Sequence, residues 1–409
     1  KLDFTYDLAE AKVTAQYTSL AAPHKLEKRL LADGTYEALP TDNGPVEEEG
    51  LERQDKLTLE GFLPAVKAQE RKSFGELMEA AKTNPNLMNV VEGKETLDEF
   101  VDKLPTEALI HLLGGQPNTG VANTFGMGNL PEYGIPNIMT ADGPAGLRIQ
   151  PQCGVNTTAW PCATLLACTW DPELIEEIGK AGGEEVKENN IGIWLTPAVN
   201  IHRSPLCGRN FEYYSEDPLL AGMMAAAMTL GVQKVPGCGT TIKHFACNNQ
   251  EDNRMGSDSI LSERALREIY LKAFEIIVKE ADPYTIMSSY NLINGVHAAN
   301  CYDTCTKAAR DEWGFAGAIM TDWTTTNVQI QGECTAAGCM RAGNDMVMPG
   351  MEEDHENIRK ELKEGTLDIR ELKRCIYNTV NIILQSNQYE EAVSYENQFD
   401  GLGEWLTVK

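Results

Sequence analysis

The sequence predicts an α/β protein whose main part is a (β/α)8 barrel, preceded by a small β-rich segment and a linker. Two observations predict this fold. From about Thr96 onward, short apolar runs alternate with stretches of helical periodicity, and polar side chains follow nearly every apolar run. The 409 residues are enough for one such domain and an appendage.

The apolar runs have the length and composition of buried strands, and amphipathic stretches separate them. The predicted strands are Asn137–Thr140, Ala163–Cys168, Ile191–Leu195, Thr240–Ile242, Thr285–Met287, Gly317–Met320 and Asp345–Met348. The predicted helices include Asp171–Asn189, Asp217–Gln233, Ser262–Lys279 and Thr304–Trp313. Regular alternation of this kind indicates repeated βα units and a parallel sheet.

A parallel sheet of this size either stays open or closes into a barrel, and two features favour the barrel. Gly179, Gly182 and Gly183 lie within a helix-like stretch and not in a turn between a strand and a helix, so a dinucleotide site is not expected. Barrel enzymes also assemble their sites from several strand ends. Polar residues of this type follow the predicted strands here: Asp142, Asn200, Lys243, His244, Ser289, Tyr290 and Asp322.

The chain is predicted to have three parts. Residues 1–90 form a β-rich segment and linker, with strands at Phe4–Tyr6 and Lys12–Tyr17 followed by a polar stretch from Ala32 to Gln54. Residues 91–388 form the barrel, and residues 389–409 form a C-terminal tail. Two isolated strands do not stabilise themselves, so the first segment is expected to pack on something else.

Composition narrows the possible partners. The chain has 61 acidic and 35 basic residues and a net charge of −26, which disfavours nucleic acid and anionic membranes and suits a neutral substrate. No apolar run approaches the ~18 residues of a membrane span. The spacing of the 11 cysteines matches no zinc pattern, so we expect free thiols, a cytoplasmic location and no metal or cofactor.

Asp322 is the first candidate for chemistry. It follows the predicted strand Gly317–Met320 and precedes Trp323. A carboxylate at the end of a strand is well placed to attack a sugar carbon, while the indole packs on the apolar face of the sugar. The simpler alternative is that Asp322 caps the following helix, which is common for aspartate.

Lys243 and His244 follow the strand Thr240–Ile242 and could hold sugar hydroxyls. Because lysine is almost never buried without a partner, Lys243 must either contact water or face a carboxylate, and a structural ion pair is the alternative to binding. Arg254 adds hydrogen-bonding capacity in the next loop. Arg209, in the polar loop 200–212, could donate two hydrogen bonds to vicinal hydroxyls.

Three further residues are candidates. Tyr290 follows the strand Thr285–Met287 and could hydrogen-bond the nucleophile or the ring oxygen of the sugar. Met287 is more often a core residue than a ligand contact, and Asp142 is a turn residue by its surroundings.

Taken together and in this order, these motifs resemble glycoside hydrolase family 3 over residues from about Thr96 to Gln385. The resemblance rests on these segments: Asp142–Pro144, Gly208–Glu212, Ser215–Pro218, Lys243–Phe245, Asn248–Glu251, Ser289–Asn291, Thr321–Trp323 and Ala342–Met346. The N-acetylglucosaminidase branch of the family carries a Ser/Thr-x-Asp-Ser-His loop after the Lys-His pair. Residues 246–254 lack that loop and are similar to the glucosidase branch.

The resemblance implies a retaining exo-β-glycosidase, most simply a β-glucosidase, acting on nonreducing-end glucose by double displacement. Asp322 would be the nucleophile. The residues implied to bind the terminal sugar are Asp142, Arg209, Lys243, His244, Arg254, Met287 and Tyr290, with Trp323 as the wall of the subsite.

The resemblance also implies a partner. In this family the acid/base is usually a glutamate of an α/β-sandwich domain, and we expect a second chain or segment to carry it. The β-rich segment is similar to the tail of a fibronectin-III-like domain in members with reversed domain order. The alternatives are a β-xylosidase or mixed-specificity enzyme, or a carbohydrate-binding subunit inactive without its partner. A metal-dependent barrel hydrolase ranks last, because no ligand set with suitable spacing is present.

Overall fold

The computed structural model describes residues 28–30, 35–38, 84–117, 121–150, 155–327 and 333–386. The chain divides into two compact units, and the smaller unit, Thr5–Phe62, contains a two-stranded antiparallel sheet. Its strands are β1 (Lys28–Leu30) and β2 (Tyr36–Ala38), with Arg29 opposite Glu37. The stretch predicted as a polar linker from Ala32 therefore includes a strand. The strands predicted at residues 4–6 and 12–17, and hence the fibronectin-III-like tail, lie outside the described residues.

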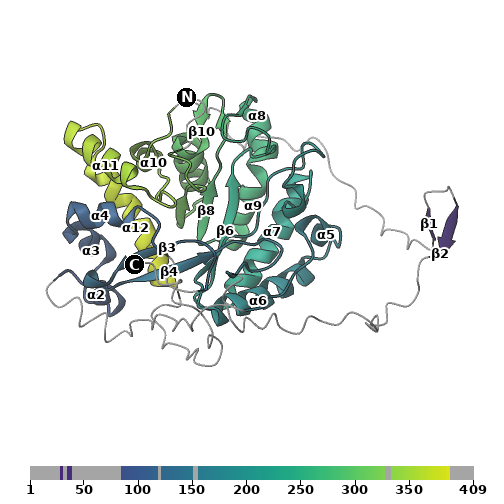
Figure 1. Ribbon diagram of the computed structural model, residues 1–409, viewed down its shortest axis with the longest axis horizontal. Helices are drawn as coiled ribbons and strands as arrows, with labels where there is room; N and C mark the ends of the chain where they lie inside the picture. Colours follow the sequence, from purple (N-terminus) through teal and green to yellow (C-terminus); the bar gives the residue numbers. More distant parts are fainter. Residues whose placement is uncertain are drawn as a thin grey trace, which may run out of the picture. The chain divides into compact units, whose positions relative to one another are not determined.

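The larger unit is built around a six-stranded sheet in the order β11-β8-β6-β5-β4-β3 (Figure 1). The strands are β3 (Gly126–Leu130), β4 (Ile135–Ala141), β5 (Ile193–Trp194), β6 (Gly239–Phe245), β8 (Thr285–Ser288) and β11 (Ala318–Met320). From β4 to β11 all neighbouring strands are parallel. Crossover connections between parallel strands contain helices, as the alternating sequence pattern predicts.

Single bridges close this sheet into a barrel. Met320 of β11 pairs in parallel with Met346, and Val347 pairs in parallel with Gly114. Gln116 then pairs antiparallel with Gly126 of β3, with hydrogen bonds of 2.7 and 2.8 Å between the two backbones. Segments 114–116 and 345–347 thus occupy the two remaining strand positions, and the predicted barrel closure is present in the described residues.

The barrel is not entirely parallel, because β3 runs antiparallel to β4. Only nine residues separate Gln116 from Gly126, fewer than the dozen or so that a parallel crossover needs. The chain therefore turns back directly. At the other end of β3, Gly134 (φ 72°) ends a short turn at residues 131–133 and lets the chain enter β4.

One predicted strand is wrong. Residues 163–168 form the helix α5 (Ala163–Ala167), which buries Ala163, Leu166 and Ala167 and exposes Leu165. This spacing of three and four residues is helical, but a run this short cannot be assigned from periodicity alone. Two barrel positions were not predicted from the sequence: the segment 114–116, which pairs only through single bridges, and β3, whose two glycines lower its strand propensity.

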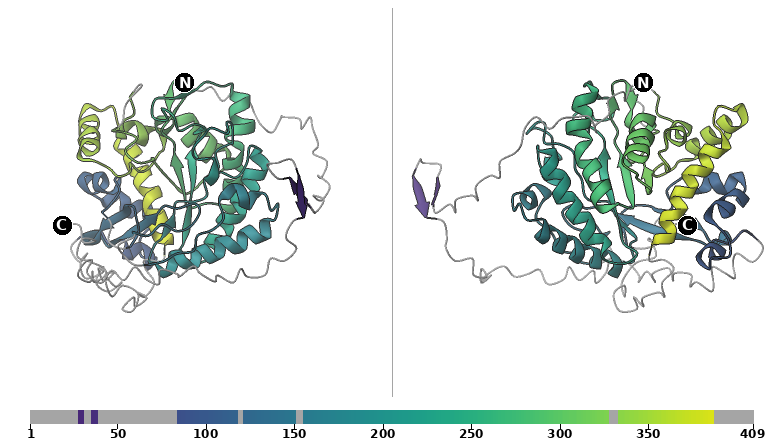
Figure 2. Two further views of the ribbon diagram at one scale, coloured as in Figure 1. Left: turned by 45° about the vertical axis from the view of Figure 1, so that its right-hand side comes forward. Right: turned by 180° about the vertical axis from the view of Figure 1, so that it is seen from behind.

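The helices surround the barrel in two groups. Around β4, β5 and β6 lie α6 (Pro172–Glu188), α7 (Pro218–Gln233) and α9 (Lys272–Ala281), side by side (Figure 1; Figure 2). Gly231 of α7 contacts α6 so closely that a Cβ there would lie 2.1 Å from the Glu176 carbonyl oxygen. Gly179, Gly182 and Gly183 lie within α6, so these glycines serve helix packing and not a phosphate turn.

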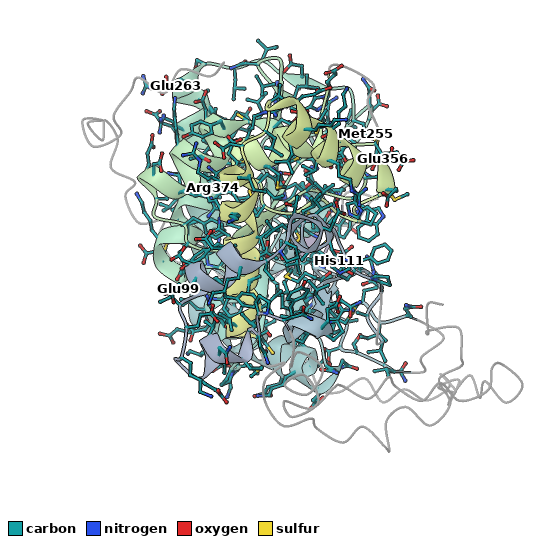
Figure 3. The ribbon with its side chains drawn as sticks, turned by 90° about the vertical axis from the view of Figure 1, so that its left-hand side faces the viewer. Glu99, His111, Met255, Glu263, Glu356 and Arg374 are labelled. Atoms are coloured by element: carbon teal, nitrogen blue, oxygen red, sulfur yellow. The ribbon has the colours of Figure 1, made fainter. Side chains whose placement is uncertain are left out.

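The second group packs near β3, β4 and β11. It comprises α2 (Met88–Val91), α3 (Leu97–Lys103), α4 (Thr106–Leu112), α10 (Ala336–Ala342), α11 (Glu352–Glu364) and α12 (Ile369–Gln385). Arg374 of α12, labelled in Figure 3, donates to the Met340 carbonyl of α10 at 2.7 Å and links these two helices. Two predicted helices differ in detail. The helix predicted at residues 304–313 is a π-helical segment, Asp303–Glu312. The helix predicted at Ser262–Lys279 consists of α8 (Glu263–Ala265), a π-helical turn at Leu266–Tyr270 and α9.

A small second sheet ties two loops of the barrel together. β7 (Asp258–Ser259) belongs to the loop after β6, and β9 (Leu292–Ile293) and β10 (Val296–His297) belong to the loop after β8. β9 lies between the other two strands. This sheet fixes the loop that carries Arg254 against the loop that carries Tyr290, at the carboxyl end of the barrel strands. No helix among the described residues is long and apolar enough to cross a membrane.

Candidate active site

The residues predicted to form a site all belong to the carboxyl ends of barrel strands or to the loops that follow. Parallel strands of a barrel present these ends at one opening, where barrel enzymes carry their sites. Asp142 follows β4, Lys243 and His244 lie at the end of β6, Tyr290 follows β8, and Asp322 and Trp323 follow β11. Arg209 lies in the loop after β5 and Arg254 in the loop after β6.

Asp322 is held by backbone on both sides. Its N–H donates to the Ser288 carbonyl of β8 at 3.1 Å, and its Oδ1 accepts from the Trp323 N–H at 2.7 Å. The side chain is 14% exposed, and its second oxygen, Oδ2, lies 3.8 Å from His244 Nε2. Burial raises the pKa of this carboxyl, against the opposing effects of the Trp323 N–H and of nearby cations. The helix-cap alternative is not what the structure shows, because residues 323–327 form a turn.

Buried Lys243 and partly exposed Asp142 form an ion pair at the barrel opening. Lys243 Nζ donates to Asp142 Oδ1 at 2.6 Å, and Arg148 Nη1 contacts the other oxygen at 3.1 Å. Burial alone would raise the pKa of Asp142, but the charge and hydrogen bond of Lys243 lower it to about 2. Lys243 therefore faces a carboxylate, which was one of the two environments the sequence allowed. The Asp142 carbonyl also accepts from the Arg148 N–H at 2.8 Å, which closes the loop that contains the turn at residues 144–145.

The two site arginines each have a carboxylate partner in their own loop. Arg209 pairs with Glu212, which is buried. Arg254 Nη1 donates to Glu251 Oε2 at 2.8 Å, and its guanidinium lies 4.7 Å from the centre of the Tyr290 ring. These pairs orient the guanidinium groups before any ligand arrives.

The Tyr290 hydroxyl donates to the Trp323 carbonyl oxygen at 2.7 Å. Burial and the neighbouring Asp322 carboxylate raise the pKa of Tyr290, so the phenol keeps its proton. Its hydroxyl therefore fixes the backbone of the residue that follows the candidate nucleophile. Met287 is buried on β8, opposite Lys243 of β6, and packs in the barrel's hydrophobic core.

Trp323 is 37% exposed, and its ring stacks on Phe125, with centroids 5.1 Å apart and planes 9° from parallel. An indole with one face supported and the other side accessible can receive the apolar face of a sugar. Phe125 was missed from the sequence because it directly precedes β3, the strand that was itself not predicted.

His244 is buried and held from several directions. The Asn200 side chain bonds both its backbone N–H and its carbonyl oxygen, each at 2.8 Å. Its Nδ1 lies 3.2 Å from the Tyr213 hydroxyl. Burial lowers the pKa of His244 well below its ordinary value, and the charges of Arg209, Lys243 and Arg254 act in the same direction, so the ring is neutral.

The charges of the opening divide in a simple way. Of its described carboxylates, Asp142, Glu212 and Glu251 each hold a cation at hydrogen-bond distance. Asp322 does not: its nearest basic partner within the described part of the chain is the neutral His244 at 3.8 Å. Asp322 is therefore the carboxylate left available for an electrophile. The described residues contain no group of three or more His, Cys, Asp or Glu side chains that could hold a metal ion.

Comparison with known proteins identifies the family of this barrel. The family model described as the glycosyl hydrolase family 3 N-terminal domain matches residues 128–380, which is more than half of the chain. The chain belongs to glycosyl hydrolase family 3. The match runs from β3 to α12, so it contains every strand end described above.

Three relatives of this family 3 chain illustrate the similarity. The chain is 49% identical to beta-glucosidase A of Butyrivibrio fibrisolvens over 93% of its own length and 46% of the relative. It is 42% identical to an exo-alpha-(1->6)-L-arabinopyranosidase of Bifidobacterium longum over 65% of its length and 35% of the relative. Beta-glucosidase 3B of Thermotoga neapolitana, solved in complex with alpha-D-glucose, matches with a TM-score of 0.68 and 40% identity, covering 76% of this chain and 45% of that one. The chain thus spans less than half the length of each of these relatives.

Proposed function

We propose that this chain is the barrel part of a retaining exo-β-glucosidase that removes nonreducing-end β-D-glucosyl residues by double displacement, with Asp322 as nucleophile. The observation that carries the proposal is the position of Asp322. It is a half-buried carboxylate without a close cation, in the opening where three other carboxylates each hold one. The similarity to proteins named beta-glucosidase supports the choice of sugar.

In the first step, Asp322 attacks the anomeric carbon and forms a glycosyl-enzyme ester while the aglycone leaves with a proton. In the second step, water hydrolyses the ester with inversion again, so the configuration is retained. The hydroxyls of the sugar are proposed to bind Asp142, Lys243, His244, Arg209 and Arg254. Trp323 would support the sugar ring through its exposed face.

These binding roles suit the pairs already described. The partly buried pair of Lys243 and Asp142 presents both a donor and an acceptor, which is what a vicinal diol needs. Tyr290 supports the site indirectly, because its hydroxyl bonds the Trp323 carbonyl and its ring lies under Arg254. Met287, packed in the core beside β6, is proposed to line the floor of the same subsite.

The proton donor is proposed to come from a partner segment or chain, on an α/β-sandwich domain. The barrel's own carboxylates support this proposal. A general acid needs a raised pKa, and a cation beside a carboxylate has the opposite effect. Asp142, with a pKa of about 2, is ionised and is not suited to deliver a proton. The side chains of Glu212 and Glu251 are directed to arginines of their own loops and not to a leaving group.

A second candidate is an exo-glycosidase that also accepts pentopyranosides, as the mixed-specificity alternative anticipates. The 42% identity to a protein named as an arabinopyranosidase favours this candidate. Comparing kcat/KM for nitrophenyl β-glucoside, β-xyloside and α-L-arabinopyranoside distinguishes it from a strict glucosidase. We also propose a cytoplasmic location, which the ten free thiols of the described residues support.

Covalent trapping tests the nucleophile. A 2-deoxy-2-fluoro glucoside with a dinitrophenyl leaving group should add one fluoroglucosyl group to the chain, and peptide mapping should place it on Asp322. Asp322→Asn should abolish labelling and lower turnover by several orders of magnitude. Asp252→Asn, in an exposed position of the loop after β6, is the matched control and should label normally. A label on any other carboxylate would overturn the assignment, and binding of glucose without labelling would favour a carbohydrate-binding subunit.

A further inference from the structure

Both ring nitrogens of His244 have defined neighbours. Nε2 lies 3.8 Å from Asp322 Oδ2, and Nδ1 lies 3.2 Å from the hydroxyl of Tyr213. A neutral imidazole carries one N–H and one lone pair, so the partner at one nitrogen decides what the other nitrogen offers. The group that bonds Nδ1 therefore sets the character of the nitrogen that faces the candidate nucleophile.

A chain of hydrogen bonds leads from Glu251 through Asn248 and Tyr213 to His244, and the charge of Glu251 fixes its direction. The Glu251 carboxylate, paired with Arg254, can only accept. The Asn248 amide nitrogen therefore faces it, at 3.1 Å, and the second hydrogen of the same nitrogen is donated to the Tyr213 oxygen at 2.9 Å. Because the Tyr213 oxygen already accepts from Asn248, its own hydrogen is directed to Nδ1 of His244.

We propose that Tyr213 is a positioning residue that fixes the tautomer and ring orientation of His244. With Nδ1 accepting from Tyr213, the ring hydrogen resides on Nε2 and points to the side of the opening where Asp322 lies. His244 then offers a donor to a sugar oxygen or to the Asp322 carboxylate. The opposite tautomer would set a lone pair against that carboxylate. The catalytic consequence rests on the proposed function, whereas the tautomer itself does not.

Burial makes this hydrogen-bond chain decisive. Tyr213 and His244 are 0% and 1% exposed, and Asn248 is 2% exposed. Water does not replace a lost partner at such depth, so an unmade bond keeps its full cost. Asn200 already holds the backbone of His244, which leaves rotation of the ring as the freedom that Tyr213 removes.

The neighbouring tyrosine provides a matched control. Tyr214 is also buried, at 3% exposure, and packs in the hydrophobic core. Its hydroxyl makes no hydrogen bond to any residue that the structure describes. Replacing either tyrosine by phenylalanine removes one oxygen from a buried ring, but only the change at position 213 removes a partner of His244.

Nitrogen NMR of the whole chain, labelled with ¹⁵N only in its six histidines, tests the proposal. The His244 signals are assigned by their loss in His244→Gln. We expect a protonated Nε2 and an unprotonated Nδ1 that accepts a hydrogen bond. In Tyr213→Phe the Nδ1 signal should move to that of a free, unprotonated nitrogen, and Tyr214→Phe should leave it unchanged. Asn248→Asp should move it in the same way, because the new carboxylate accepts the Tyr213 hydrogen.

Kinetics with dinitrophenyl β-glucoside give the second readout. Tyr213→Phe should lower kcat/KM about ten-fold, as expected for a buried hydrogen bond, and Tyr214→Phe should not. A wild-type spectrum with the hydrogen on Nδ1, or an Nδ1 signal unchanged in Tyr213→Phe, overturns the proposal. The wild-type spectrum and Asn248→Asp decide the question even where Tyr213→Phe does not fold. A chain with the expected tautomer that hydrolyses no glycoside contradicts the proposed function and not this assignment.

Discussion

Replacing Lys243 by methionine tests both the role of this lysine in the fold and its proposed role in binding. Methionine keeps most of the volume of the side chain and removes the charge. In the folded chain, Asp142 has a pKa of about 2 instead of 3.8, chiefly because Lys243 offsets the effect of burial. This lowering corresponds to about 2 kcal/mol of stabilisation at neutral pH. Lys243→Met should therefore lower the free energy of unfolding by roughly that amount, and it should also lower kcat/KM.

The pH dependence of this loss has a definite sign. A carboxyl whose pKa is lowered by folding contributes its full stabilisation above its unfolded pKa and loses it as the pH falls towards the folded value. In Lys243→Met, burial raises the pKa of Asp142 without the opposing lysine. The difference between wild type and Lys243→Met should thus be complete at neutral pH, should shrink as the pH falls through the raised Asp142 pKa of the variant, and should vanish as the pH approaches about 2, where Asp142 of the wild type is also protonated.

Urea unfolding followed by tryptophan fluorescence measures this difference. Lys180→Met is the matched control, because Lys180 pairs with Glu184 on α6 and both side chains are 57% exposed. Exposed pairs contribute about 0–1 kcal/mol. Equal losses in the two variants, or a loss for Lys243→Met that stays constant from pH 7 down to pH 3, would refute the reasoning from Asp142.

Three further predictions concern other parts of the barrel. Trp323→Ala should lower kcat/KM for aryl glucosides about ten-fold with little change in stability, and unchanged kinetics would rule out the proposed sugar wall. The chain alone should release dinitrophenol from its glucoside, because that group leaves without a proton, but should cleave cellobiose only once the partner segment is added. If the chain alone hydrolysed cellobiose as fast as it does with the partner segment, the general acid would lie within this chain. Arg310→Met leaves the fully buried Asp345 without its cation, so calorimetry should show a free energy of unfolding lower by about 3–5 kcal/mol. The control Arg264→Met, which removes an exposed ion pair, should lower it by less than about 1 kcal/mol.

The sequence was sufficient for the parts of the fold that local patterns specify. The helices α6 and α7 end within a residue or two of their predicted bounds, because each begins with an aspartate cap followed by proline. The barrel's closure was also predicted, from polar residues at many strand ends. By contrast, β3 is a glycine-rich strand whose pairing is set by the short connection from Gln116, and that constraint is visible only in three dimensions.

The sequence placed the predicted site residues at one opening, because most of them follow a recognisable strand, but it did not identify their partners. The sequence allowed an ion pair for Lys243 without identifying Asp142, which lies 101 residues away. Tyr213 directly follows the polar loop 200–212, and Phe125 directly precedes the unpredicted strand β3. Neither position carries a local signal, since the distance of Tyr213 from His244 depends on how the loop after β5 folds over β6.

The distribution of charge explains how one carboxylate can remain reactive beside several cations. A carboxylate gripped directly by lysine or arginine is stabilised as an ion and makes a weak nucleophile. In this opening Lys243, Arg209 and Arg254 are each held by another carboxylate, so their charges act on Asp322 only from a distance. Burial keeps the pKa of Asp322 raised despite those cations, which makes its oxygens more basic. On the proposed function, the ion pairs around Asp322 would bind and orient a neutral substrate and would leave the attacking oxygen free to form, and later release, the glycosyl ester.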